Sequence, residues 1–208
     1  AATGMKLQKE FDCLADEVFY KTCTAINENA QYLSRTIEDF RNFIKGERVK
    51  SIFKVKDNIQ SFLNLVEGSI KNNNIKIVLN LENDLEINGY NNELIQCFIN
   101  IFNNAKDVLK ELDIKNKYIF ITAHRENDFI IIKLKDNGNG IPENIISKVF
   151  EPYFTTKNKK QGTGLGLHMT YKLIVEGMNG SIEAKNVSYE YNEENYTGAE
   201  FSIILPIN

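Results

Sequence analysis

The chain carries two glycine clusters, Asp136-Asn137-Gly138-Asn139-Gly140 and Gly162-Thr163-Gly164-Leu165-Gly166-Leu167, separated by a segment rich in Asn, Lys and Thr. Residues 129–135 are apolar and β-branched, and they predict a buried strand that delivers Asp136 to the end of a sheet. A buried carboxylate there needs donors, and the exocyclic amine of a flat heterocycle is a suitable one. The second cluster opens a helical pattern whose free backbone N–H groups suit phosphate. Together the clusters favour a nucleotide site, and the alternative is a pair of ordinary glycine turns around a loop.

A helix predicted over residues 92–109 supplies a third element. Its apolar residues recur at helical spacing, at positions 94, 95, 98, 101, 102, 105, 108 and 109. Asn100 and Asn104 share one face of this helix because they are one turn apart. Amide oxygens on one face can hold a hydrated Mg²⁺ that also takes phosphate oxygens. The helix therefore adds a metal and phosphate site to the nucleotide hypothesis.

These elements resemble the catalytic, ATP-binding domain of sensor histidine kinases, within the GHKL ATPase superfamily. Asn100 to Asn104 is similar to the N box, Asp136 to Gly140 to the G1 box, Phe150-Glu151-Pro152-Tyr153-Phe154-Thr155-Thr156-Lys157 to the F box, and Gly162 to Leu167 to the G2 box. The motifs stand in family order, and the similarity covers residues 50–207. The resemblance implies ATP and Mg²⁺ as cofactors, and a phosphoryl transfer to a histidine and thence to the receiver domain of a response regulator.

The resemblance also implies a role for individual residues. Asp136 would bind the adenine amino group, Asn104 would bind Mg²⁺, and Asn100 would lie on the phosphate side; these two asparagines are the candidate catalytic residues. The full set of candidate nucleotide-binding residues is Asn100, Asn104, Lys106, Asp107, Asp136, Gly138, Gly140, Ile141, Thr156, Lys157, Gly162, Thr163, Gly164, Leu165, Gly166 and Leu167.

Asn100 separates the candidate activities. In gyrase-like and chaperone-like members of the superfamily, a Glu at this position activates water, and Asn has no basic carboxylate with which to do so. Asn100 therefore favours a kinase over an ATP-hydrolysing GHKL machine. The other alternative, an anti-sigma-type serine kinase, would share the fold but lack the heptad helix of residues 19–44. A degenerate scaffold that binds no nucleotide would be expected to have lost one of the motifs.

The pattern along the rest of the chain predicts an α+β fold, a mixed β-sheet with helices on one face. Strands 118–124 and 129–135 are expected to form a hairpin, and a polar, Tyr-rich loop is expected between the last two strands. Strands are predicted at 51–55, 75–81, 85–90, 118–124, 129–135, 181–184 and 199–205; helices are predicted at 59–70, 92–109 and 164–177, with a short helical piece near 143–150 inside a lid of residues 137–161.

The amino-terminal region has a heptad pattern instead. Its apolar seam is Phe19, Cys23, Ile26, Ala30, Leu33, Ile37, Phe40 and Ile44. Such a stripe needs a partner, so residues 14–45 are predicted to form a homodimer, and the alternative is packing onto the chain's own ATP domain. The expected organisation is a partial dimerisation region at 1–47 and the catalytic domain at 48–208.

Residues 27–43 resemble the second helix of a kinase dimerisation domain, in the subclass whose acceptor box is His-Gln-Trp-Arg-Gln-Pro-Leu. That box is absent, and the chain has only His124 and His168. Neither lies in the dimerisation region, so the acceptor is expected upstream of Ala1 and the chain is not expected to phosphorylate itself.

Composition limits the remaining classes of function. A formal net charge of −3 and the lack of a basic stripe argue against nucleic acid. No apolar run reaches the roughly 20 residues of a membrane span, so membrane attachment is expected only through segments outside this chain. Cys13, Cys23 and Cys97 are odd in number and widely spaced, which fits reduced thiols and a cytoplasmic location.

Overall fold

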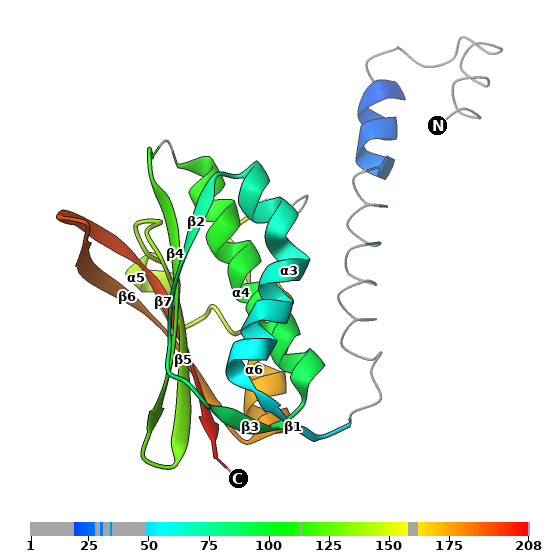
Figure 1. Ribbon diagram of the computed structural model, residues 1–208. Coiled ribbons are helices and arrows are strands. Elements are labelled where there is room, and N and C mark those ends of the chain that lie inside the picture. The colour runs from blue at the N-terminus through cyan, green and yellow to red at the C-terminus, as the bar shows by residue number, and fades with distance from the viewer. Residues whose placement is uncertain are drawn as a thin grey trace.

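The computed structural model describes residues 19–27, 30, 34, 49–112, 114–157 and 162–207. A five-stranded sheet with the order β2-β4-β5-β7-β6 forms one layer of the molecule (Figure 1). β2 runs parallel to β4 and the other neighbours are antiparallel, so the sheet is mixed. The strands are β2 (Ile75–Leu81), β4 (Lys117–Glu126), β5 (Phe129–Asp136), β6 (Ser181–Tyr191) and β7 (Glu194–Pro206).

Helices α3 (Val55–Asn72), α4 (Asn91–Glu111) and α6 (Gly166–Tyr171) cover one face of this sheet (Figure 1). Helix α6 continues as the π-helix η1 (Lys172–Gly177). β1 (Ser51–Lys54) and β3 (Glu86–Gly89) pair separately as a small antiparallel sheet. The predicted α+β class, with a mixed sheet and helices on one face, is confirmed.

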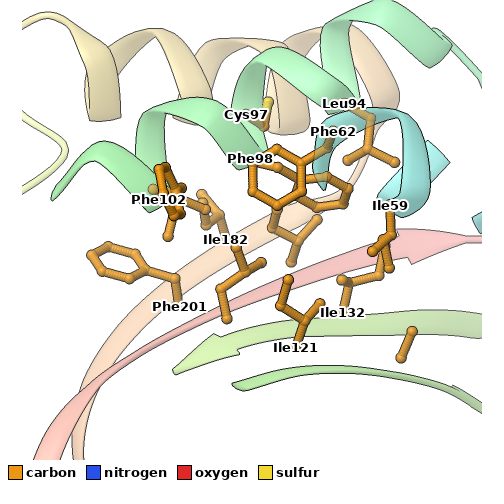
Figure 2. Close-up of a cluster of buried hydrophobic side chains, with 14 of the residues drawn as sticks. Ile59, Phe62, Leu94, Cys97, Phe98, Phe102, Ile121, Ile132, Ile182 and Phe201 are labelled. Atoms are coloured by element: carbon orange, nitrogen blue, oxygen red, sulfur yellow. The ribbon is translucent and has the colours of Figure 1, made fainter. Parts of the chain in front are cut away.

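The core lies between the helices and the sheet because both present an apolar face to it. Phe62 of α3 makes edge-to-face contacts with Phe98 and Phe102 of α4, with ring centroids 5.6 and 5.9 Å apart. Ile121 and Ile132 of the sheet lie beneath these rings (Figure 2). Each buried side chain of this size stabilises the fold by about 1.5–3 kcal/mol. This packing fixes α4, which carries the N box, against the strand that carries Asp136.

The loop predicted between residues 184 and 199 was wrong. β6 and β7 form one continuous hairpin, paired from Ser181 opposite Ile204 to Tyr191 opposite Glu194. Its turn residues Asn192 and Glu193 both have positive φ, at 52° and 64°, as a tight hairpin turn requires. The turn contains no glycine, so the usual local signal for a two-residue hairpin turn is missing there.

Aromatic packing explains why the hairpin extends so far. Tyr189 and Tyr191 of β6 and Tyr196 of β7 pack against Tyr118 and Phe120 of β4, and the Phe120 and Tyr191 ring centroids are 4.9 Å apart. Edge-to-face aromatic pairs stabilise neighbouring strands beyond their area of burial. The tyrosines that suggested a polar loop are therefore strand residues.

Two predicted helices differ in their details. The helix predicted over 164–177 begins at Gly166, and its second half has π-helical hydrogen bonding. The helical piece predicted near 143–150 is limited to α5 (Glu143–Ile146) and is followed by turns.

The predicted dimer interface of residues 14–45 lies mostly outside the described residues. Residues 19–27 are helical, as the heptad pattern predicts. Ile26, a seam residue, is 63% exposed, and Phe19 is buried beside Tyr20. The division at residues 47 and 48 and the homodimer remain predictions.

Candidate nucleotide site

Asp136 lies at the carboxyl end of β5 and is only 6% exposed. Its Oδ1 accepts hydrogen bonds from the backbone N–H of Gly138 at 2.7 Å and of Ala199 at 3.2 Å. Burial raises the pKa of this carboxyl, and the two backbone donors oppose that shift. Within the described residues, Oδ1 accepts both of the hydrogen bonds that are donated to this carboxyl group. Oδ2 is therefore the oxygen able to accept from an amine.

β7 passes so close to Asp136 that only glycine fits beside it. A Cβ at Gly198 would lie 1.7 Å from the Asp136 carbonyl oxygen. The same carbonyl accepts a hydrogen bond of 2.9 Å from the Tyr189 hydroxyl. Ala199, Gly198 and Tyr189 thus hold Asp136 in place. The sequence does not predict these contacts, because they depend on the register of the β6–β7 hairpin, part of which it predicts as a loop.

Gly138 and Gly140 serve the loop in different ways. A Cβ at Gly138 would lie 2.7 Å from Cγ1 of Val108, so this glycine lets the loop approach α4. Gly140 has a φ of +80°, which a side chain rarely adopts. Asn186 of β6 then fixes the next residue, Ile141: its Oδ1 accepts from the Ile141 N–H and its Nδ2 donates to the Ile141 carbonyl, both at 2.7 Å. Asn186 lies outside the motifs, so the sequence does not predict it as a site residue.

Asn100 binds the G2 box. Its Nδ2 donates to the Gly166 carbonyl at 3.0 Å and to the Thr170 Oγ1 at 3.1 Å, and its Oδ1 accepts from Gln96. A Cβ at Gly166 would make only ordinary van der Waals contact with the Asn100 amide carbon, at 3.7 Å. Asn100 therefore holds the start of α6 against α4.

Asn104 binds the F box. Its Nδ2 donates to the Asn100 carbonyl at 3.0 Å, and its Oδ1 accepts from the Lys157 ammonium at 3.2 Å. Lys157 also forms an ion pair of 2.7 Å with Asp107 Oδ2. Lys106 donates to Asn103 at 2.9 Å and lies 3.4 Å from the other Asp107 oxygen. The predicted phosphate-site residues Lys106, Asp107 and Lys157 thus form one charged cluster with Asn104.

The G2 and F boxes cross each other closely. Gly164 has a φ of +67°, and a Cβ there would lie 2.4 Å from the Tyr153 backbone. Tyr153 itself has a φ of 63° and is 71% exposed. A Cβ at Gly162 would lie 2.7 Å from the Thr155 hydroxyl. These two glycines let the G2 loop pass against the F box.

The other G1, F and G2 residues occupy supporting positions. The Leu165 N–H donates to the Thr163 hydroxyl at 3.3 Å. Leu167 packs against the core, as does Ile141. Thr156 is exposed. His168 Nδ1 lies 2.9 Å from the Phe150 carbonyl, which can only accept, so this nitrogen carries the proton.

One face of α4 therefore contacts the G1, F and G2 boxes. Asn100 contacts the G2 box, Asn104 contacts the F box through Lys157, and Val108 contacts the G1 loop at Gly138. These residues are successive turns of one helix and span roughly 12 Å. The residues that the sequence predicts for the base and for the phosphates are therefore arranged along one helix.

The sequence profile of the histidine kinase-, DNA gyrase B-, and HSP90-like ATPases matches residues 89–208, which include every one of these motifs. The chain belongs to this ATPase family. Sporulation kinase E of Bacillus subtilis (strain 168) is 35% identical over 147 residues, which are 70% of this chain and 18% of that protein. The chain spans between 18% and 25% of the first three curated relatives that it matches.

Solved histidine kinases share the fold. The catalytic domain of histidine kinase ThkA is 27% identical, with a TM-score of 0.61 over 76% of this chain and 95% of that one. ThkA in complex with the response regulator protein TrrA matches 99% of this chain and 56% of its own with a TM-score of 0.69 at 22% identity. Full-length ShkA in complex with AMPPNP matches 98% of this chain and 42% of its own with a TM-score of 0.67 at 20% identity. The chain thus has the catalytic-domain fold of sensor histidine kinases.

Within the described ranges, the structure has no helix that is both long enough and apolar enough to cross a bilayer.

Proposed function

We propose that this chain binds ATP with Mg²⁺ and donates the γ-phosphoryl group to a histidine on the dimerisation helix of a sensor kinase, from which it passes to a response regulator. The ATPase family, the similarity to a sporulation kinase and the ThkA–TrrA complex support this proposal. The observation that carries it is the face of α4 along which the N box meets the other three motifs.

The residues present fit a nucleotide and its metal. Asp136 offers Oδ2, in an enclosed position, to the adenine amino group. Asn104 offers an amide oxygen, a ligand type that Mg²⁺ accepts. Lys106 and Lys157 would neutralise phosphate charge, and the G2 residues from Gly162 to Leu167 would approach the phosphates through their backbone. Bound Mg²⁺ would stabilise the charge that develops on the transferred group.

The chain's own contribution to transfer is positioning. Asp136 and the Gly138–Ile141 loop would orient the base, while Asn100 holds the G2 box against α4. Positioning and charge neutralisation supply most of the catalysis of phosphoryl transfer. Asn100 carries no carboxylate that could deprotonate water, so the site favours transfer over the alternative of ATP hydrolysis.

The acceptor histidine is proposed to lie outside this chain. His168 uses Nδ1 to hold the Phe150 carbonyl, and His124 lies on β4 beside Glu126. Both belong to the ATP-binding domain. A homodimer through residues 14–45 would bring the acceptor helix to the site; the alternative is packing of that region onto the chain's own ATP domain.

Calorimetric titration with ADP and Mg²⁺ tests the nucleotide site. The unsubstituted chain should bind, and Asp136→Ala should lose about 10- to 100-fold in affinity, because a hydrogen bond to a charged group contributes about 1.5–3 kcal/mol. Asp128→Ala is the matched control, since Asp128 is an exposed carboxylate at the other end of β5. Equal ADP affinities for the Asp136→Ala variant and the control would contradict the proposal that Asp136 binds the adenine amino group.

A further inference from the structure

A single ammonium group joins the F box to the N-box helix. Lys157 Nζ lies 2.7 Å from Asp107 Oδ2 and 3.2 Å from Asn104 Oδ1. The two oxygens come from the same face of α4 and converge on one point, where a positive charge is located. All three residues are partly buried; the Lys157 side chain is 25% exposed and that of Asp107 is 36% exposed.

This pair of oxygens is also a ligand pair for a small divalent cation. Magnesium prefers carboxylate and amide oxygens at about 2.0–2.1 Å. A metal at that distance from Asn104 Oδ1 would be in close contact with an ammonium that holds the same oxygen. Like charges so close together repel strongly, so Lys157 and the metal exclude each other from this position.

We propose that Asn104 Oδ1 and Asp107 Oδ2 form one cation seat for which Lys157 and Mg²⁺ compete, and that Asp107 thereby sets how strongly magnesium promotes nucleotide binding. The inference rests on the proposed function. It assigns Asp107 as a second protein ligand of the metal beside Asn104, and it gives Lys157 two positions, the seat and the phosphate that arrives with the metal.

Charge around the seat supports this assignment. Lys106 lies 3.4 Å from Asp107 Oδ1, so both oxygens of this carboxylate face cations. Without the metal, the Asp107 carboxylate repels an incoming polyphosphate and holds Lys157 away from it. With the metal, the carboxylate becomes a ligand and Lys157 is released to the phosphate. Asp107 therefore opposes nucleotide binding when the metal is absent and favours it when the metal is present.

The test is the ratio of the Kd for ADP in EDTA to the Kd in saturating Mg²⁺, measured by calorimetry. Asp107→Asn should lower this ratio by about tenfold, because the metal loses its charged ligand while metal-free ADP loses a repulsive neighbour. Lys157→Met should raise the ratio, because metal-free ADP then meets an Asp107 carboxylate that has lost its ion pair, while the metal has no competitor for the seat. These two effects together outweigh the single lysine contact to the phosphate that the variant loses in Mg²⁺. The two substitutions therefore move the ratio in opposite directions.

Lys110→Met is the matched control. Lys110 is an exposed lysine in the last turn of α4, and it should leave the ratio within about twofold of the unsubstituted value, because exposed charges beyond the seat are screened. Circular dichroism checks that each variant is folded. If Asp107→Asn does not fold, the rise expected for Lys157→Met still decides the outcome.

An ion pair that only fastens the F box to α4 predicts a different result. Asp107→Asn and Lys157→Met would then break the same contact and change ADP affinity alike in both buffers. Unchanged ratios, or ratios that move in the same direction, would overturn the shared seat while leaving nucleotide binding intact. Failure of the unsubstituted chain to bind ADP in either buffer would overturn both the proposed function and this inference.

Discussion

At the residue scale, Asp136 shows that folding and ligand binding make opposite demands. The fold encloses the carboxylate among apolar neighbours and gives it two backbone donors, both on Oδ1. Burial is the larger effect, and it raises the pKa above that of the same group in the unfolded chain. A buried acid with a raised pKa costs stability once it is ionised.

Asp136→Asn should therefore stabilise the ligand-free protein at neutral pH. Because the folded state has the higher pKa, it binds more protons than the unfolded state between the two pKa values, and the free energy of unfolding falls as pH rises through that window. The Asp136→Asn variant has no carboxyl group to titrate at this position, so its free energy of unfolding does not fall for this reason. Thermal unfolding should show equal midpoints well below the ordinary pKa of Asp, about 3.9, and a higher midpoint for the variant at pH 7.

The same substitution should weaken ADP binding, because the new amide nitrogen is a donor where the adenine amine needs an acceptor. A variant that is less stable than the parent at pH 7, or that has a midpoint difference independent of pH, would contradict the sign of this shift. Retained ADP affinity would instead contradict the assignment of Oδ2 to the base.

At the element scale, the β6–β7 hairpin positions the base end of the site. Through Gly198 and Ala199 it lies against the Asp136 backbone and carboxylate, and through Asn186 it holds the loop at Ile141. The edge-to-face contact between the Tyr118 and Tyr191 rings holds the hairpin against β4. This element carries no nucleotide motif and still determines where the motif residue points.

Gly198→Ala should destabilise the protein by several kcal/mol and weaken ADP binding, because its Cβ would collide with a backbone oxygen that has no room to move. Gly68→Ala in α3 is the control: nothing lies within 4 Å of its Cβ position. That substitution should stabilise the protein by about 0.5–1 kcal/mol, since alanine favours a helix over glycine. Chemical denaturation measures both. Equal stabilities for the two variants would mean that the hairpin does not pack on Asp136 as described.

At the scale of the whole molecule, the sequence predicts the motifs and most of the helices and strands. It does not predict which residues of other elements contact the motifs. The N-box helix and the strand before Asp136 could be predicted because each is encoded by local periodicity and a local motif. Ala199, Asn186 and Thr170 escaped prediction, because their roles depend on strand register and on which helix packs beside α4. No local pattern contains that information.

The roles of the predicted lysines were also beyond a local pattern. The resemblance predicts phosphate contacts for Lys106 and Lys157, and the structure adds that both lie beside Asp107. An ion pair between residues so far apart in the sequence becomes visible only when the F box is placed against α4. The shared cation seat is therefore a consequence of the fold.

The arrangement of the whole chain leads to a final prediction about its activity in isolation. Incubated with labelled ATP and Mg²⁺, it should show neither self-phosphorylation nor rapid hydrolysis. Self-phosphorylation is not expected because the chain has only two histidines, and both His124 and His168 belong to the ATP-binding domain. Rapid hydrolysis is not expected because Asn100 is an amide engaged with Gly166 and Thr170.

A dimerisation domain that carries the acceptor histidine should become labelled when it is added in trans, and the label should be acid-labile. The control is the same experiment with Asp136→Ala at an ATP concentration near the Kd of the unsubstituted chain, where the weaker binding of the variant should strongly reduce transfer. Acid-labile label on His124 or His168 would show that the domain supplies its own acceptor. Brisk hydrolysis that survives Asn100→Ala would show that another group activates water, and it would move this chain from the kinases to the ATP-hydrolysing branch of its family.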